Sequence, residues 1–349
     1  MSFNPSSVFP RGLFLMFAVL GMILSSGCSN VVYKVTGDTM ISFGEDKMIP
    51  YLLTTDDTRI GCVSGEALTP LMLSFGTVTS PPDDLEVLIH MVGGGCASNR
   101  ATDLDIDASR YAQERRVGEA QDARIMAKRW HAVAAQRYYK GYKALVRSMG
   151  DIGGECPQFA DEQAQLVWIL GTAVSLQAVM ADGLSGSQVG VPRDIAPKAE
   201  RAAACLDTPR GNQRWWGLPK SIRAILWTVV PGLGPEGSDP WKELEKAIKI
   251  GEHEGVRMAF ALTALAAYND SNVPLVRDVI RRYATSAERV AGSREYKLID
   301  IMANDLIVSM SDRLWTEATG HRTPVGKLGS FWDDKPDVPE VNVEIDDLF

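Results

Sequence analysis

The feature that most constrains the fold is the helical spacing of apolar residues along the chain after residue 28. Between residues 166 and 174, apolar side chains follow an i, i+3, i+4 pattern, and residues 298–314 carry one at every fourth position. No run alternates apolar and polar residues over enough positions for a sheet. We therefore expect an all-α fold built from stacked helix hairpins.

Helix boundaries are marked by proline, acidic residues and glycine. Asp239-Pro240 predicts a helix start, and Pro81 to Asp84 opens another segment. The expected connections are short, as in neighbouring hairpins. A 34-residue repeat does not hold along the chain, so any tetratricopeptide-like repeats are degenerate. We predict a degenerate tetratricopeptide-like helical bundle.

The first 27 residues have the pattern of a secretory signal. Arg11 precedes the apolar run Leu13–Leu24, and small residues follow it. The run has 12 residues, and a bilayer-spanning helix needs about 20. We therefore expect residues 1–27 to be removed on export.

Cys28 ends a stretch, Leu24-Ser25-Ser26-Gly27-Cys28, that resembles a bacterial lipobox, with its leucine one position further upstream than usual. In such signals the cysteine thiol is acylated after cleavage, and several acyl chains make a durable anchor. Ser29 matches the sorting pattern of outer-membrane lipoproteins. The alternative is an ordinary signal peptide with an incidental cysteine.

The composition of residues 28–349 limits the functions that this part of the chain can have. Cleavage leaves 322 residues, and because it removes Arg11 and no acidic residue, the formal net charge changes from −8 to −9. This acidic balance argues against nucleic acid, which needs clustered Lys and Arg. We expect a single helical domain at residues 28–321. An extended acidic tail follows at residues 322–349, where Phe331 and Trp332 are available to anchor it to the body or to a partner.

Four cysteines follow Cys28, an even number that favours disulfides in an oxidising compartment. We favour the pairs Cys62–Cys96 and Cys156–Cys205, because each pair flanks adjacent expected helices. Four buried free thiols are the alternative.

The signals of catalysis and metal binding are weak. Gly93-Gly94-Gly95 lacks the third glycine of a dinucleotide loop, and no strand–helix alternation follows it. The four histidines are far apart in sequence, and His253 has no second histidine at metalloprotease spacing. Asp103, Asp105 and Asp107 lack the glycine and glutamate of a calcium loop. We expect a protein without enzymatic activity, metal or cofactor.

Aromatic and methionine side chains are the candidate contacts to a ligand or partner. Trp215 and Trp216 are adjacent in a Gly/Pro-rich loop, where we expect one to pack inward and the other to face a cavity, a partner or the membrane. The alternative is that both pack in a satellite cluster. Further candidates are Met126, Trp130, Trp168 and Met302, which are equally compatible with ordinary core positions.

Several blocks of the chain resemble the T component of TRAP transporters, a family of TatT-like lipoproteins. The resemblance lies in residues Pro50–Asp57, Gly61–Phe75, Ala123–Arg129, Arg137–Leu145 and Trp215–Gly217. It implies a helical periplasmic lipoprotein with cryptic tetratricopeptide-like hairpins that pairs with a substrate-binding protein. It also implies a hydrophobic cargo, such as a fatty acid or sterol-like lipid, and in some members a trimer.

The leading hypothesis is therefore a non-enzymatic accessory lipoprotein on the periplasmic face of the outer membrane. It would dock a soluble binding protein and pass a hydrophobic ligand through an apolar cavity. A helical-repeat scaffold with protein partners only is the second hypothesis. An envelope enzyme is the third, and it would need a cleft with converging titratable groups.

Overall fold

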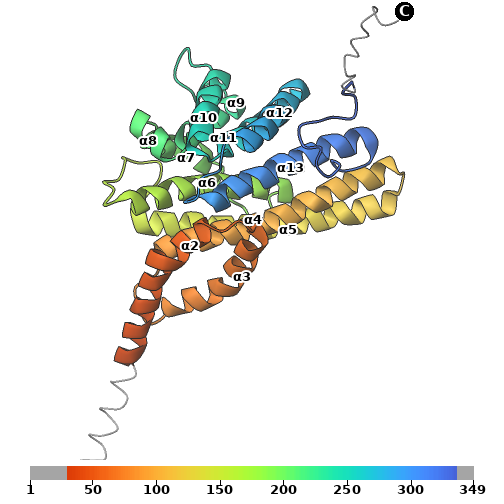
Figure 1. Cartoon of the computed structure of the whole chain (residues 1–349). Helices are drawn as coiled ribbons and strands as arrows, with labels where there is room; N and C mark the ends of the chain where they lie inside the picture. Colours follow the sequence, from red (N-terminus) through yellow and green to blue (C-terminus); the bar gives the residue numbers. More distant parts are fainter. Residues whose placement is uncertain (1–29, 336–349) are drawn as a thin grey trace, which may run out of the picture. The chain divides into compact units, whose positions relative to one another are not determined.

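A computed structural model describes residues 30–335, and within that range every regular element is a helix (Figure 1). The expected all-α fold is confirmed for this part of the chain, which contains no β-strand. Residues 30–43 form the first helix and continue through a π-helical turn into α2. The elements that follow are η1 (Gly44–Met48), α2 (Ile49–Leu53), α3 (Thr58–Phe75), α4 (Asp83–Gln113), α5 (Val117–Met149), α6 (Glu162–Ser185), α7 (Ile195–Ala204), α8 (Pro209–Arg214), α9 (Leu218–Val229), α10 (Pro240–Glu254), α11 (Met258–Asn269), α12 (Val273–Arg289) and α13 (Lys297–Thr319).

The described residues divide into two compact units. Unit 1 contains residues 30–98, 131–206 and 294–298, and unit 2 contains residues 99–130, 207–293 and 299–335. The division passes through α4 and α5, so each of these long helices contributes to both units.

Unit 1 combines the N-terminal helices with parts of α4 and α5 and with α6 and α7. The guanidinium of Arg147 in α5 binds the carboxylates of Asp83 and Glu86 in the first turns of α4, at 2.8 and 2.6 Å. α6 begins after Asp161, whose side chain accepts the amide of Ala164, and ends at Gly186 in the left-handed conformation. The ion pairs join the end of α5 to the start of α4, and the two caps mark the ends of α6.

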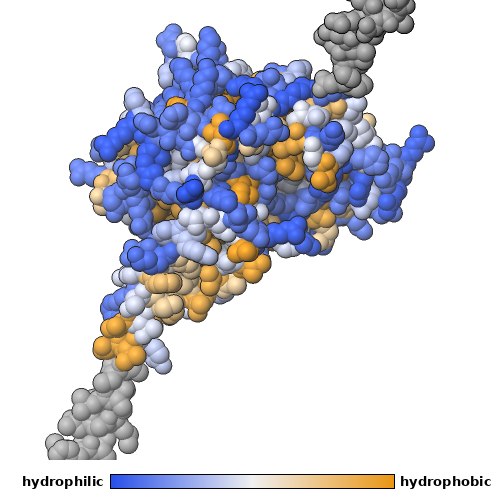
Figure 2. Space-filling model, in the orientation of Figure 1, coloured by the Kyte–Doolittle hydropathy of each residue, from blue (hydrophilic) through white to orange (hydrophobic). Residues whose placement is uncertain are grey.

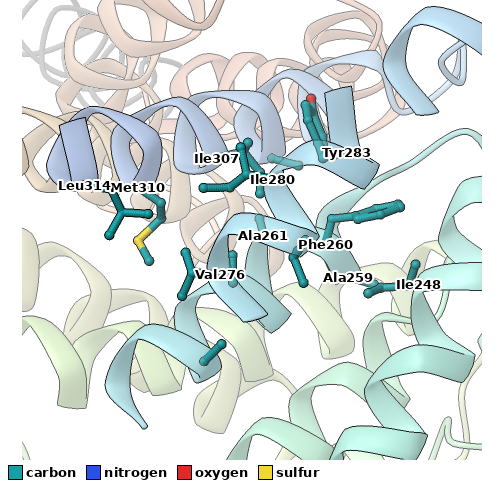
Figure 3. Packing of buried hydrophobic residues seen from close by; sticks show 14 of the residues in the cluster. Ile248, Ala259, Phe260, Ala261, Val276, Ile280, Tyr283, Ile307, Met310 and Leu314 are labelled. Carbon is teal, nitrogen blue, oxygen red and sulfur yellow. The ribbon is translucent and has the colours of Figure 1, made fainter. Parts of the chain in front are cut away.

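The core of unit 2 is a cluster of buried apolar residues contributed by α10 to α13 (Figure 3). Phe260 and Tyr283 pack edge to face with ring centroids 5.9 Å apart, and both side chains are almost fully buried. The buried pair Arg257–Asp300 lies in the same unit, with 2.5 Å between Nη1 and Oδ2. The amide of Arg257 also donates to Asp300. Apolar packing and one buried ion pair thus join α11, α12 and α13.

Residues after α13 also pack within unit 2. Phe331 is buried in the core cluster. The guanidinium of Arg277 lies over the rings of Phe331 and Trp332 and pairs with Asp333. The first part of the acidic tail is therefore held against α12 up to residue 335.

The tetratricopeptide-like arrangement is not confirmed. Helix lengths range from 5 residues in α2 to 33 in α5, so no unit of fixed length recurs among the described helices. The charged stretch from Ser109 to Met149 is divided between α4 and α5 by a break between Gln113 and Val117, where Arg115 adopts a left-handed φ of 60°. This turn separates α4 from α5.

Candidate functional site

The N-terminal hairpin, residues 30–78, has the most unusual surface of the described chain. It consists of the continuous helical residues 30–53 and the following α3. Gly37 is buried in the first helix, and a Cβ placed there would approach Thr79, Val78 and Phe75. The start of the first helix therefore lies beside the end of α3, as in an antiparallel hairpin.

α3 buries Gly61, Gly65 and Met72 and leaves several other large apolar residues exposed to solvent. Gly61 and Gly65 are buried, and a Cβ on Gly65 would lie 3.0 Å from Val92 in α4. Ile60, Val63 and Leu71 are exposed, Val63 by 68%. An ordinary surface helix has the opposite arrangement, with its apolar stripe facing the core.

The first helix of the hairpin exposes apolar residues in the same way. Residues 31–36 are all exposed, and four of them are large and apolar, namely Val31, Val32, Tyr33 and Val35. Phe43 and Tyr51 extend the exposed apolar surface along this helix. Figure 2 shows apolar residues gathered over the hairpin.

Charged groups of the hairpin pair with the body of unit 1. Glu66 accepts from the guanidinium of Arg137 at 2.6 Å, and Asp56 pairs with Lys297 at 2.9 Å. The hydrogen bond and charge of Lys297 lower the pKa of Asp56. Burial, together with the nearby carboxylates of Asp84 and Asp46, raises the pKa of Glu45. Asp46, Lys47 and Arg59 are exposed on the hairpin beside its apolar side chains.

Disulfides join helices within unit 1 and confirm both predicted pairs. Cys62 in α3 is bonded to Cys96 in α4, and Cys156 is bonded to Cys205 at the end of α7, each with Cα atoms 5.5 Å apart. The first bond fixes the hairpin to α4 although α3 buries little apolar surface. Cys28, the predicted lipidation site, lies outside the described residues.

Three of the candidate tryptophans are packing residues. Trp168 is buried in α6, and its Nε1 donates to the carbonyl of Ala202 in α7 at 2.9 Å. Trp215 and Trp216 are both buried and meet edge to face with ring centroids 6.4 Å apart. Of the two arrangements considered for this pair, the structure has the one in which both pack inward, because the segment folds into α8 and a tight turn instead of an open loop.

Two features stabilise the turn at residues 215–217, which contains both tryptophans. Gly217 has a φ of 75°, and a Cβ there would lie 2.7 Å from the carbonyl oxygen of Ala247 in α10, so only glycine fits. Asp207 pairs with Lys220 at 3.2 Å and Arg223 at 2.6 Å. Burial alone would raise the pKa of Asp207, but hydrogen bonds from Asn212 and Arg223, with the charge of Lys220, hold that pKa below its ordinary value.

The other candidate contacts lie in unit 2 and have different surroundings. Met126 in α5 is exposed, as is its neighbour Ile125. Trp130 is partly buried beneath the guanidinium of Arg100, which is 4.9 Å from the ring centroid. Met302 in α13 is also partly buried. Of the six candidates, Met126 alone is exposed to solvent.

The described residues contain no group of three or more His, Cys, Asp or Glu side chains arranged to hold a metal ion. His90 is buried, with Nε2 3.4 Å from Glu86. Burial raises the pKa of Glu86, but the hydrogen bond with His90 and the charge of Arg147 outweigh it, so this pKa is lowered. This pair also belongs to the network that joins α4 and α5 through Arg147.

In the described part of the chain, α6 is the one helix long and apolar enough to cross a bilayer, and 61% of its most apolar window is buried. Its buried side chains, Trp168 among them, make it a core helix of unit 1.

In comparisons with known proteins, no protein-family model, curated protein or solved structure matches this chain.

Proposed function

We propose that this chain is a non-enzymatic, lipid-anchored accessory protein on the periplasmic face of the outer membrane. It docks a soluble periplasmic binding protein and serves the transport of a hydrophobic small molecule. Cys28 and the signal pattern before it support the anchor and the compartment. The two disulfides are consistent with an oxidising compartment.

The observation that carries the docking function is the exposed apolar surface at the start of α5. Ile125 and Met126 are adjacent there and both exposed, at 48% and 38%. Methionine adapts its shape to a partner, which suits a surface that binds and releases a soluble protein. The binding protein docks on this part of α5.

Site-specific photocrosslinking in cells tests this assignment. A photoreactive residue at Met126 is expected to capture one soluble periplasmic protein. The same residue at Lys128, two positions along the same exposed segment, points to a different face of the helix and is the matched control. Equal capture at both positions, or capture at neither, contradicts docking through Met126.

The hydrophobic cargo is the narrower part of the proposal and rests on the resemblance to T components of TRAP transporters. The second candidate is a scaffold with protein partners only. It is favoured by the burial of Trp168, Trp215 and Trp216 in packing contacts, which removes them from any ligand-lining role.

Native mass spectrometry separates these two candidates. The processed chain is incubated with a lipid extract of the source cells and then analysed intact. A retained hydrophobic molecule supports transport, whereas an empty protein that still gives the Met126 crosslink supports the scaffold.

A further inference from the structure

We propose that the N-terminal hairpin lies on the bilayer, with the outward apolar residues of both its helices inserted at the boundary between headgroups and acyl chains. This inference rests on the anchoring at Cys28 in the proposed function and adds a second, non-covalent membrane contact. The hairpin thereby sets the orientation of unit 1 on the membrane.

The first argument is the short distance from the anchor. Val31 follows Cys28 by three residues, and an extended chain spans at most about 3.6 Å per residue, so their Cα atoms are within about 11 Å. The headgroup layer on each side of a bilayer is roughly 5–8 Å thick. When Cys28 is acylated, the start of the first helix therefore cannot leave the membrane surface.

The second argument is that this helix end is exposed and that four of its six residues are large and apolar. Every residue from 31 to 36 is exposed, and the sequence Val31-Val32-Tyr33-Lys34-Val35 has a single charge, which pairs with Asp38 at 2.7 Å. A helical segment that is apolar on all sides is stable when something apolar surrounds it. The headgroup–acyl boundary supplies such surroundings next to the anchor.

The third argument is the reversed pattern of α3. Its glycines allow close packing on α4, and the disulfide Cys62–Cys96 holds it there. The large side chains at positions 60, 63 and 71 are thus free to bind something outside the chain. Because the end of α3 lies beside Gly37, this stripe belongs to the same hairpin as the anchor-proximal valines.

The residue types fit a lipid surface better than a soluble protein partner. Tyr33 and Tyr51 are exposed on the first helix, and tyrosine is enriched at membrane–water interfaces. The other exposed large apolar residues of the hairpin are mainly aliphatic, so binding depends on inserted apolar area and needs no excess of anionic lipid. A soluble partner on this face would have to compete with the membrane that the anchor holds beside it.

The test uses the processed chain, residues 28–349, with Cys28→Ser so that no acyl chain contributes. A single cysteine is introduced as Val32→Cys or Val63→Cys and labelled with a polarity-sensitive fluorophore. Matched controls are Leu184→Cys in α6 and Val229→Cys in α9, both exposed apolar positions outside the hairpin. The four remaining cysteines are paired in disulfides, so labelling is selective.

Vesicles of phosphatidylethanolamine and phosphatidylglycerol are then added. We expect a blue shift and stronger emission at positions 32 and 63, and no change at 184 and 229. An unchanged spectrum at position 63 overturns the proposal, as does a shift there that appears on concentrating the protein without vesicles, because that result indicates self-association. The intact mass of the acylated wild-type protein tests the anchor separately, so failure of the anchor and failure of the hairpin contact are distinguishable.

Discussion

The N-terminal hairpin and the core cluster of unit 2 both contain large apolar residues, but the cluster buries them and the hairpin exposes many of them to solvent. In the core cluster, Phe260 and Ile280 are nearly inaccessible to solvent. In α3 the glycines are buried, while Ile60 and Val63 are exposed. Both regions carry apolar residues at helical spacing, so the strength of the pattern does not separate them. The direction of the apolar stripe distinguishes a folding core from an interaction surface.

The largest expected difference between the two regions is in stability. Phe260→Ala empties a buried site and should lower the free energy of unfolding by about 3–5 kcal/mol. Val63→Ala removes methyl groups that already face water, so its effect should stay within about 0.5 kcal/mol. Urea denaturation of each variant, followed by circular dichroism, measures both values. A large loss for Val63→Ala would show that α3 buries its apolar stripe in the free protein.

The two disulfides allow the weakly buried helix α3 to be compared with the well-packed helices α6 and α7. The loops they close span 34 and 49 residues, and chain entropy assigns each bond about 4 kcal/mol. Because α3 buries few apolar residues, replacing Cys62 and Cys96 by serine should release α3 locally. Replacing Cys156 and Cys205 should instead lower global stability, since α6 and α7 are well packed. Hydrogen exchange of residues 58–75 in the two double variants checks this difference.

Glycine substitutions test how closely the helices of unit 1 pack. A Cβ on Gly94 in α4 would lie 2.4 Å from the ring of Tyr138 in α5, so Gly94→Ala should destabilise by about 1–3 kcal/mol. Gly183 in α6 has no atom within 4 Å of such a Cβ, so Gly183→Ala should stabilise by up to about 1 kcal/mol. Thermal melts of both variants measure the two effects, and equal signs would contradict the packing.

The smallest expected effect is a pH dependence at Asp207. Its pKa is lowered in the folded protein, so its pairing with Lys220 and Arg223 stabilises the fold at pH values above the ordinary Asp pKa of about 4. This stability is lost as the pH falls through the folded-state pKa. The difference in unfolding free energy between wild type and Asp207→Asn, on the order of 1 kcal/mol at pH 7, should shrink towards pH 3. Glu236→Gln, at an exposed loop position, is the control and should show no such trend.

Much of the fold follows from local sequence rules. The cap at Asp239 and the apolar spacing within α6 and α13 are local signals, so helices in these three segments were predictable. The disulfide pairs were predictable because each joins helices that are close in sequence. Such features depend on neighbours along the chain.

The candidate site depended on information that the sequence does not contain. Nothing in the periodicity of α3 tells which face meets α4. That choice is made by the fit of Gly61 and Gly65 against Val92, which depends on distant residues. The sequence could not decide between the two arrangements of Trp215 and Trp216 for a similar reason. The turn that buries both side chains requires Gly217 to pack against Ala247 in α10.

The most direct test of the membrane-facing hairpin is the partition of the processed Cys28→Ser chain onto phospholipid vesicles. Two double variants are compared with it: Val32→Ser with Val63→Ser, and Leu184→Ser with Val229→Ser. Each removes two exposed apolar side chains, in the first case from the hairpin and in the second from elsewhere. If the hairpin inserts, the first pair should lower the partition coefficient about tenfold, equivalent to about 1.4 kcal/mol, and the second should leave it unchanged. Equal losses in the two double variants, or no loss in either, would contradict the account.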